Sequence, residues 1–327
     1  MAERPALSIQ DLDVSFDTPE GEVSAVTGLN IDVAHGETLA IVGESGSGKS
    51  QSFLATMGLL TRNGHATGRA MLDGKDLLAM DRNELDKHRG REISMVFQDP
   101  MTAFNPMLRL SRQLTETLAI HKGLTQGAAR IQAIEMLERV GIPDPEKRIA
   151  TYPYQLSGGM RQRAMIAMAL LCRPKVLIAD EPTTALDVTI QAQILELFAD
   201  LKREFGMALV LITHDLGVVA ALADRIAVMY AGRIVEEASC DELFERPRHP
   251  YTRALLQSTP RADEDAATLY VIPGQPPNLQ RLPAGCSFMP RCPSAVESCR
   301  LAPPPLEPVA RDHKAACFRA RELEEMV

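Results

Sequence analysis

Apolar and polar positions in the first part of the chain follow patterns typical of β-strands. The segments ALSIQDLDVSF (6–16), EVSAVTGLNIDV (22–33) and ETLAIVG (37–43) alternate or run apolar between turn residues, so each predicts a strand. The third of these leads directly into a glycine-rich turn. Further along the chain, the apolar runs VLIAD (176–180) and ALVLIT (208–213) predict two more strands.

Helical patterns lie between these predicted strands. The stretch VTIQAQILELFADLKREF separates the last two, and an alternation of strand, helix and strand predicts a parallel sheet with crossover helices. Residues 106–155 change character, because RIQAIEMLERVG is helical in pattern while Pro143, Pro145 and Pro153 interrupt it. We therefore expect an inserted helical subdomain at about residues 100–175.

Composition shifts near residue 250. The last 77 residues hold 11 of the 22 prolines and four of the six cysteines. We expect an α/β main domain at residues 1–250 and a small, Cys- and Pro-rich C-terminal domain at residues 251–327. With 45% hydrophobic residues, a chain of 327 residues is able to bury a large core.

Charge and hydropathy exclude several classes of protein. The net charge of -8 and the pI near 5.5 argue against binding to nucleic acid, whose partners usually carry a basic excess. No segment approaches the roughly 18 uninterrupted apolar residues of a membrane-spanning helix, and the N-terminal residues do not resemble a signal peptide. We expect a cytosolic chain, in which the six cysteines would not form a disulfide framework.

The segment GESGSGKS at 43–50 fits the phosphate-binding pattern G-x-x-x-x-G-K-[ST]. It lies between a predicted strand and a helix predicted to begin near Lys49, which is the context that the pattern requires. Backbone N–H groups of such a loop wrap a phosphate, the lysine reaches the outer phosphates, and the final hydroxyl ligates Mg²⁺. A flexible glycine loop is the plainer alternative. The predicted nucleotide-binding residues are Gly43, Ser45, Gly46, Gly48, Lys49 and Ser50.

The strand VLIAD ends in two carboxylates, Asp180 and Glu181. At a strand tip beside the phosphate loop, Asp180 is placed to hold the Mg²⁺ shell, and Glu181 is free to polarise an attacking water. This pair predicts hydrolysis of the nucleotide as well as binding. Without the phosphate loop, two solvated carboxylates would be the simpler interpretation.

The segment LSGGMRQR at 156–163 predicts a second anion-binding helix end. Ser157, Gly158 and Gly159 have the composition of an N-cap and first turn for the helix RQRAMIAMALLC. Two phosphate-binding helix ends in one chain suggest a composite site, in which nucleotide bound at Lys49 of one subunit is completed by Ser157 of another. Dimerisation would then depend on ATP. Taken alone, SGG is equally an ordinary loop.

These segments, in this order, resemble the ABC transporter ATPases, and over nearly the full length the chain is similar to the ATP-binding subunits of bacterial oligopeptide and dipeptide importers. The resemblance rests on GESGSGKS, FQDPMTAFNP, LSGGMRQR, VLIADEPTTALD, ITHDLGVV, HPYTRALL and PGQPPNLQRLPAGCSFMPRCP. It implies a P-loop ABC ATPase core with a mixed sheet that has a parallel RecA-like part, an antiparallel β subdomain and the helical insert. It also implies that ATP hydrolysis drives peptide import.

The resemblance implies roles for four further residues. It implies that Gln98 is a lid residue that senses Mg²⁺ and water. It also implies that Asp187 makes a contact across a dimer and that His214 is a switch that touches the γ-phosphate. Phe16 becomes the aromatic residue that stacks on adenine. The plainer alternatives are a loop amide for Gln98, a cap or core residue for His214, and a core position for Phe16.

The resemblance further implies partners and a location. A second ABC ATPase subunit, distinct from this chain, would complete a heterodimer that binds two membrane permease subunits. A periplasmic or extracellular peptide-binding protein would act through the complex, and the chain would lie on the cytoplasmic side of the bacterial cell membrane. Two other classes stay open: an ABC protein that acts on DNA ends or ribosomes, and an iron–sulfur protein in redox or sensing.

Four cysteines near the C-terminus, Cys286, Cys292, Cys299 and Cys317, form a candidate metal-ligand set. Structural zinc sites usually include a pair about two to four residues apart, whereas five, six and seventeen residues separate these cysteines. Irregular spacing with a Cys-Pro step suits a cluster held by four thiolates somewhat better. The resemblance adds weight to a 4Fe-4S cluster, and zinc or unligated thiols remain the alternatives.

Overall fold

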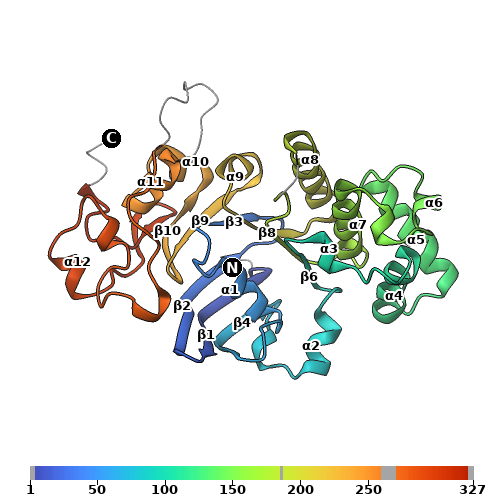
Figure 1. Cartoon of the computed structure of the whole chain (residues 1–327), viewed down its shortest axis with the longest axis horizontal. Helices are drawn as coiled ribbons and strands as arrows, with labels where there is room; N and C mark the ends of the chain where they lie inside the picture. Colours follow the sequence, from blue (N-terminus) through green and yellow to red (C-terminus); the bar gives the residue numbers. More distant parts are fainter. Residues whose placement is uncertain (1–3, 185–186, 259–269, 323–327) are drawn as a thin grey trace.

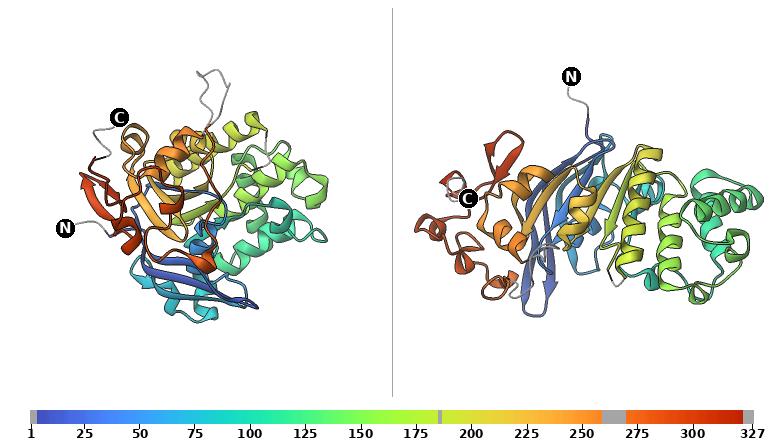
Figure 2. Two further views of the ribbon diagram at one scale, coloured as in Figure 1. Left: turned by 60° about the vertical axis from the view of Figure 1, so that its left-hand side comes forward. Right: turned by 90° about the horizontal axis from the view of Figure 1, so that it is seen from above.

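A computed structural model describes residues 4–184, 187–258 and 270–322 of the chain (Figure 1). Two residues of the segment VLIADEPTTALD, at 185–186, lie outside these ranges. The described strands form two sheets, one of four strands and one of eight. The helices cover the larger sheet and extend from one of its edges (Figures 1 and 2).

The smaller sheet is antiparallel, with the strand order β2-β1-β4-β5. Apolar residues of β1, among them Leu7, Ile9 and Leu12, are buried in one core with Phe53 of the first helix, while polar residues alternate with them. This sheet confirms the two N-terminal strands predicted from alternation. Its strands are β1 (Leu7–Thr18), β2 (Gly21–Val33), β4 (Gly64–Leu72) and β5 (Lys75–Asp76).

The larger sheet has the order β11-β12-β10-β9-β3-β8-β7-β6 and is mixed. Neighbours from β9 to β6 pair in parallel, and neighbours from β9 to β11 pair antiparallel. Every residue of β3, β6, β7 and β8 is buried, as expected for central parallel strands covered on both faces. The strands are β3 (Thr38–Val42), β6 (Ile93–Val96), β7 (Val176–Asp180), β8 (Ala208–Thr213), β9 (Arg225–Tyr230), β10 (Arg233–Ser239), β11 (Glu307–Ala310) and β12 (His313–Ala315).

The helices fall into two groups. Those around the sheet are α1 (Lys49–Thr56), α2 (Arg82–His88), α8 (Val188–Phe205), α9 (Leu216–Leu222), α10 (Cys240–Glu245), α11 (Pro250–Gln257) and, in the tail, α12 (Ser298–Leu301). Between β6 and β7 the chain inserts α3 (Pro100–Ala103), α4 (Leu110–Lys122), α5 (Gln126–Arg139), α6 (Pro145–Arg148) and α7 (Gly158–Leu170). The helices α4, α5 and α6 lie at one end of the molecule, opposite α12 (Figures 1 and 2). Across the described ranges, no helix is both long and apolar enough to span a bilayer.

The described residues from 270 onward pack against the rest of the chain, and the expected domain boundary at residue 250 stays a prediction. Strand β12 pairs with β10, so the hairpin β11–β12 extends the main sheet. Phe288 and Ile272 are buried in the same core as Val42 and Tyr230. Without this hairpin, β10 would be an exposed sheet edge, and the pairing gives its backbone groups hydrogen-bond partners. We call residues 270–322 the tail.

Candidate functional site

The phosphate loop joins the end of β3 to the start of α1, as the sequence predicts. Gly43 has a φ of 154°, and a Cβ there would lie 2.1 Å from the carbonyl oxygen of Met229. Gly48 has a φ of 100°, and its Cβ would lie 2.4 Å from the carbonyl oxygen of Ala25. Both positions therefore require glycine, because the surrounding backbone leaves no space for a side chain.

The polar groups of this loop fit a phosphate ligand. Lys49 is 6% exposed, and its Nζ donates to the carbonyl oxygens of Gly43 at 2.7 Å and Glu44 at 3.0 Å. Burial lowers the pKa of Lys49, and the nearby carboxylates of Glu181, Asp180 and Glu44 oppose that shift. Among the described residues, the buried Ser47 hydroxyl has no hydrogen-bond partner, which leaves a polar atom available to a ligand. Ser45 and Gly46 lie exposed at the tip of the loop.

Ser50 and Asp180 are brought together from positions 130 residues apart. The Ser50 hydroxyl donates to Oδ1 of Asp180 at 2.8 Å, because α1 begins beside the carboxyl end of β7. Burial raises the pKa of Asp180, and the hydrogen bond from Ser50 opposes that shift. A hydroxyl and a partly desolvated carboxylate are oxygen ligands that suit Mg²⁺.

The three predicted catalytic residues, Gln98, Glu181 and His214, meet in one cluster. Oε2 of Glu181 accepts hydrogen bonds from Nε2 of Gln98 at 2.8 Å and from the Thr184 hydroxyl at 2.9 Å. Nδ1 of His214 lies 3.2 Å from Oε1 of the same carboxylate. Glu181 has a φ of 45°, an uncommon conformation for a non-glycine residue, at the point where the chain leaves β7. Sequence reasoning did not single out Thr184, although it lies three residues after Glu181.

Ser157, with Gly158 and Gly159, and the proposed dimer contact Asp187 lie at the N-termini of two helices. The Ser157 hydroxyl accepts from the backbone N–H of Met160 at 3.3 Å, so it caps α7 as predicted, and Gly158 and Gly159 open that helix. Asp187 caps α8 by accepting from the N–H of Ile190 at 2.9 Å. In the described ranges, the cap hydrogen bonds of Ser157 and Asp187 stay within their own helices and do not reach the phosphate loop of the same chain.

Phe16 lies on β1, half-buried, with Gly64 opposite it on β4. A Cβ on Gly64 would lie 2.7 Å from Cε1 of the Phe16 ring, so the ring covers the glycine backbone. The side chain also packs against the core shared by the smaller sheet and α1. This position is compatible with the core interpretation and leaves the adenine-stacking role a prediction.

The four cysteines of the tail line one small cavity, together with Phe288 and Met289. Burial raises the pKa of the Cys286, Cys292 and Cys317 thiols, that of Cys317 to about 11. In the part of the chain that the structure describes, however, no three His, Cys, Asp or Glu side chains come close enough to hold a metal ion. The sequence-based prediction of a 4Fe-4S cluster, or of zinc, is therefore not supported by this geometry.

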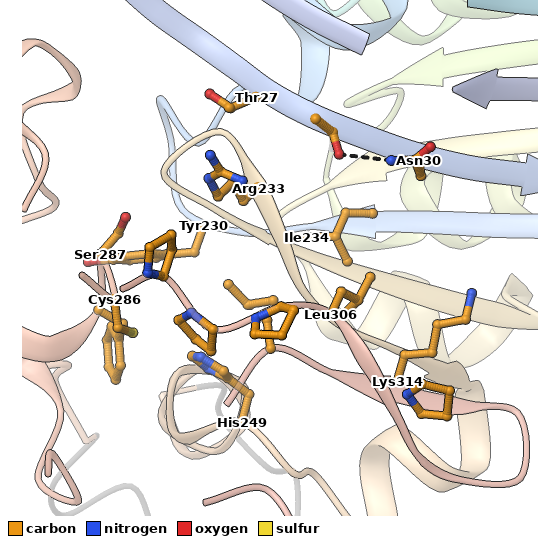
Figure 3. A pocket seen from close by; sticks show the side chains of 18 residues that line it. Thr27, Asn30, Tyr230, Arg233, Ile234, His249, Cys286, Ser287, Leu306 and Lys314 are labelled. Atoms are coloured by element: carbon orange, nitrogen blue, oxygen red, sulfur yellow. Dashed lines mark hydrogen bonds between the residues drawn. The ribbon is translucent and has the colours of Figure 1, made fainter. Parts of the chain in front are cut away.

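A cavity of about 420 Å³ lies next to the cysteine cavity, between the tail and the strands β2, β9 and β10, and Cys286 lines both (Figure 3). It is separate from Lys49 and from Glu181, which do not line it. We assign the chemistry to the phosphate loop, because Lys49, Ser50 and Asp180 converge there. The residues that line the 420 Å³ cavity include Thr27, Asn30, Tyr230, Arg233, Ile234, His249, Cys286, Ser287, Leu306 and Lys314.

Comparison with protein families identifies two matching regions. Residues 26–184 match the ABC transporter family, and residues 235–299 match the family described as oligopeptide/dipeptide transporter, C-terminal region. The oligopeptide transport ATP-binding protein OppD of Salmonella typhimurium is 54% identical over 316 residues, which cover 97% of this chain and 94% of that protein. The chain belongs to the oligopeptide and dipeptide transport family of ABC ATP-binding proteins. The resemblance inferred from the motifs is confirmed, and the chain is an ABC ATPase.

A further relative and two solved structures support this family assignment. The dipeptide transport ATP-binding protein DppD of Bacillus subtilis is 53% identical over 295 residues, covering 90% of this chain and 88% of that protein. A solved dimeric ATP-binding cassette in a post-hydrolysis state, bound to ADP and Pi, has a TM-score of 0.65 at 28% identity and covers 72% of this chain and 98% of its own. CbiO1 from Clostridium perfringens, part of an ABC transporter complex, has a TM-score of 0.62 at 29% identity, covering 74% of this chain and 91% of its own. These structures confirm the P-loop ABC ATPase fold.

Proposed function

We propose that this ABC ATPase energises the import of oligopeptides or dipeptides across the bacterial cell membrane. The observation that carries the cargo class is the match of residues 235–299 to the C-terminal region of oligopeptide and dipeptide transporters. The phosphate loop alone carries no such information, since ATP binding is general among ABC ATPases. In this proposal residues 1–250, with the helical part at about 100–175, bind ATP, and residues 251–327 form the family-specific C-terminal part.

Glu181 is the general base in the proposed reaction. Its carboxylate accepts from Gln98 and Thr184 on one oxygen and contacts His214 on the other, so its orientation is set by three side chains. A water held at this carboxylate would transfer a proton to it while attacking the γ-phosphate of ATP. Gln98 positions that water, and His214 lies beside it to contact the γ-phosphate.

Ser50, Asp180 and Gln98 would hold Mg²⁺. The Ser50 hydroxyl is hydrogen-bonded to Asp180, and Gln98 is hydrogen-bonded to Glu181, the residue after Asp180. The ion supplies positive charge at the phosphates when it is bound. Lys49 supplies a second positive charge from within the loop, and its present partners are two carbonyl oxygens that are able to release it to a stronger acceptor.

A second ATPase subunit completes each site in this proposal. Ser157, Gly158 and Gly159 offer an exposed helix N-terminus that has no nucleotide-loop partner within the described chain. Asp187 would contact the facing subunit, and Phe16 would stack on adenine. The solved cassette with a similar fold is dimeric, which supports a two-subunit arrangement.

The proposed assembly contains a distinct second ABC ATPase subunit, two membrane permease subunits and a periplasmic or extracellular peptide-binding protein, and no nucleic acid. The chain would lie on the cytoplasmic side of the cell membrane. To test this, the tagged full-length chain is isolated from solubilised membranes and its companions are identified by mass spectrometry. We expect two polytopic membrane proteins and a second ATPase, and ATP-dependent uptake of a labelled tripeptide or dipeptide by the reconstituted complex. Recovery with ribosomes or DNA, or uptake of a different solute only, would contradict the proposal.

We also propose that Cys286, Cys292, Cys299 and Cys317 are a ligand set for a 4Fe-4S cluster, with zinc as the alternative. Support comes from their lining a single cavity although they are spread over 32 residues. Side-chain rotations would be needed to bring the sulfurs to ligand distance. Iron and zinc analysis of anaerobically purified protein tests this directly. About four irons per chain that are lost in Cys292→Ser would support the cluster, one zinc per chain would support the alternative, and neither metal would exclude both.

A further inference from the structure

Glu44, the second residue of the phosphate loop, is held by an arginine of the tail. Nη1 of Arg291 lies 2.7 Å from Oε2 of Glu44, and Nη2 lies 2.9 Å from Oε1, so the pair is bidentate. The Arg291 side chain is 5% exposed and that of Glu44 is 23% exposed. A bidentate arginine fixes both the position and the plane of a carboxylate, and low exposure limits its screening by solvent.

Other contacts fix Arg291 independently of Glu44. Its Nε donates to the carbonyl oxygen of Pro273 at 2.8 Å, and Nη1 also donates to the Tyr230 hydroxyl at 3.3 Å. The guanidinium carbon lies 5.9 Å from the ring centroid of Tyr230 and 5.8 Å from that of Phe288. The tail and β9 therefore set where this charge lies, and Glu44 follows it.

The main chain of Glu44 is also held from outside the loop. Its backbone N–H donates to the hydroxyl of Tyr251 at 2.8 Å, and Tyr251 is fully buried. On the other side, the Glu44 carbonyl oxygen accepts from Nζ of Lys49 at 3.0 Å and from the N–H of Ser47 at 3.2 Å. Glu44 thus links residues beyond position 250 directly to the lysine that reaches the phosphates.

The charge of Glu44 is unfavourable for the ligand of this loop. A carboxylate at the second position of the loop repels the triphosphate of ATP and attracts Lys49 toward itself. Arg291 offsets that charge at short range while keeping the carboxylate turned toward the tail. Loss of Arg291 would leave a partly buried, unpaired carboxylate beside the phosphate site.

We propose that Arg291 is a positioning residue for ATP binding, which acts by orienting and neutralising Glu44 so that the phosphate loop and Lys49 are available to the nucleotide. The tail of this family would then be part of the nucleotide site as well as a cover for the edge of the sheet. The proposal rests on the assignment of residues 43–50 as the phosphate loop.

The test measures ATP affinity of the full-length chain by displacement of a fluorescent ATP analogue. We expect Arg291→Met to raise the Kd for ATP about tenfold. Adding Glu44→Gln to it removes the unpaired charge and should restore the Kd to within about threefold of the starting value. Arg300→Met is the matched control, because Arg300 lies in the same tail, pairs with Glu297 at the surface and is predicted to leave the Kd unchanged.

A folded Arg291→Met variant that binds ATP normally would overturn the proposal, and so would a weakened affinity that Glu44→Gln does not rescue. If Arg291→Met alone does not fold, Glu44→Gln is compared with the double variant. Equal affinities support the proposal, whereas a further loss of tenfold or more contradicts it. Lys49→Ala tests separately whether residues 43–50 are the phosphate loop. Retained ATP binding in that variant would show that this assignment is wrong.

Discussion

Replacing Glu181 by glutamine tests the proposed chemistry with the smallest change in shape. The substitution keeps the side-chain length and removes the proton-accepting charge. Gln98 and Thr184 now donate to Oε2 of Glu181, and both are able to reorient toward an amide, since an amide carries an acceptor and a donor. We therefore expect the substitution to change the free energy of unfolding by about 1 kcal/mol or less.

The effect on rate should be much larger. A positioned general base accounts for about 10² to 10⁴ in rate, which corresponds to about 3 to 5 kcal/mol of activation free energy. Binding of ATP should persist, because Lys49 takes its contacts from the carbonyl oxygens of Gly43 and Glu44 and not from Glu181. The variant should therefore trap the ATP-bound state.

The assay is steady-state ATP hydrolysis by the assembled transporter, with ATP affinity of the isolated chain measured in parallel. Glu196→Gln is the matched control, since Glu196 is an exposed glutamate on α8. We expect turnover of Glu181→Gln to fall at least about a hundredfold while the control keeps its activity. Turnover within a few-fold of the unmodified protein, with binding intact, would refute the assignment of Glu181 as the base.

Three further predictions concern the facing site, the loop and pH. Ser157→Arg should leave the ATP affinity of the isolated chain unchanged and block hydrolysis at the facing site of the assembled transporter. Lost ATP binding by the isolated, folded variant would show that Ser157 acts within its own chain. Gly48→Ala should lower both ATP affinity and thermal stability, since its Cβ would lie 2.4 Å from the Ala25 carbonyl oxygen, whereas Gly127→Ala in α5 has free space and should be tolerated in the same melting experiment. Burial lowers the pKa of His249 from 6.5 to about 4. Between pH 4 and pH 6.5 the unfolded chain therefore binds more protons than the folded chain. The free energy of unfolding should fall by up to about 3 kcal/mol as pH decreases from 6.5 to 4. Denaturant titrations at pH 4.5, 5.5 and 7 should show this slope, and His249→Asn, which keeps a capping side chain, should flatten it; an unchanged slope would contradict the reasoning.

The sequence by itself determined the elements and the type of site. Helix α8 and strand β8 coincide with their predicted segments, because burial of a helix face or of a central strand leaves a periodic or continuous apolar pattern. The phosphate loop is also local: its glycines, Lys49 and Ser50 lie within eight residues, so their order alone specifies the turn and the helix that follows.

Two expectations depend on packing between segments that lie far apart in the sequence. Composition marked the C-terminal part as different, yet the hairpin β11–β12 completes the main sheet through β10, and no local pattern identifies the strand that it joins. Cysteine spacing likewise predicted a metal centre, whereas ligand distances depend on how loops fold back on one another.

Only the tertiary structure decided which side chains meet. The bond from Ser50 to Asp180 spans 130 residues, the bond from Gln98 to Glu181 spans 83, and the pair of Arg291 with Glu44 spans 247. Parallel strand order explains the first two, because β3 and β7 both flank β8, β6 flanks β7, and all these strands end at the same edge of the sheet. No sequence motif marks the pair of Arg291 with Glu44, because this contact depends on the tail packing against β9 beside the phosphate loop. Such packing is determined by complementary shape and charge over the whole fold.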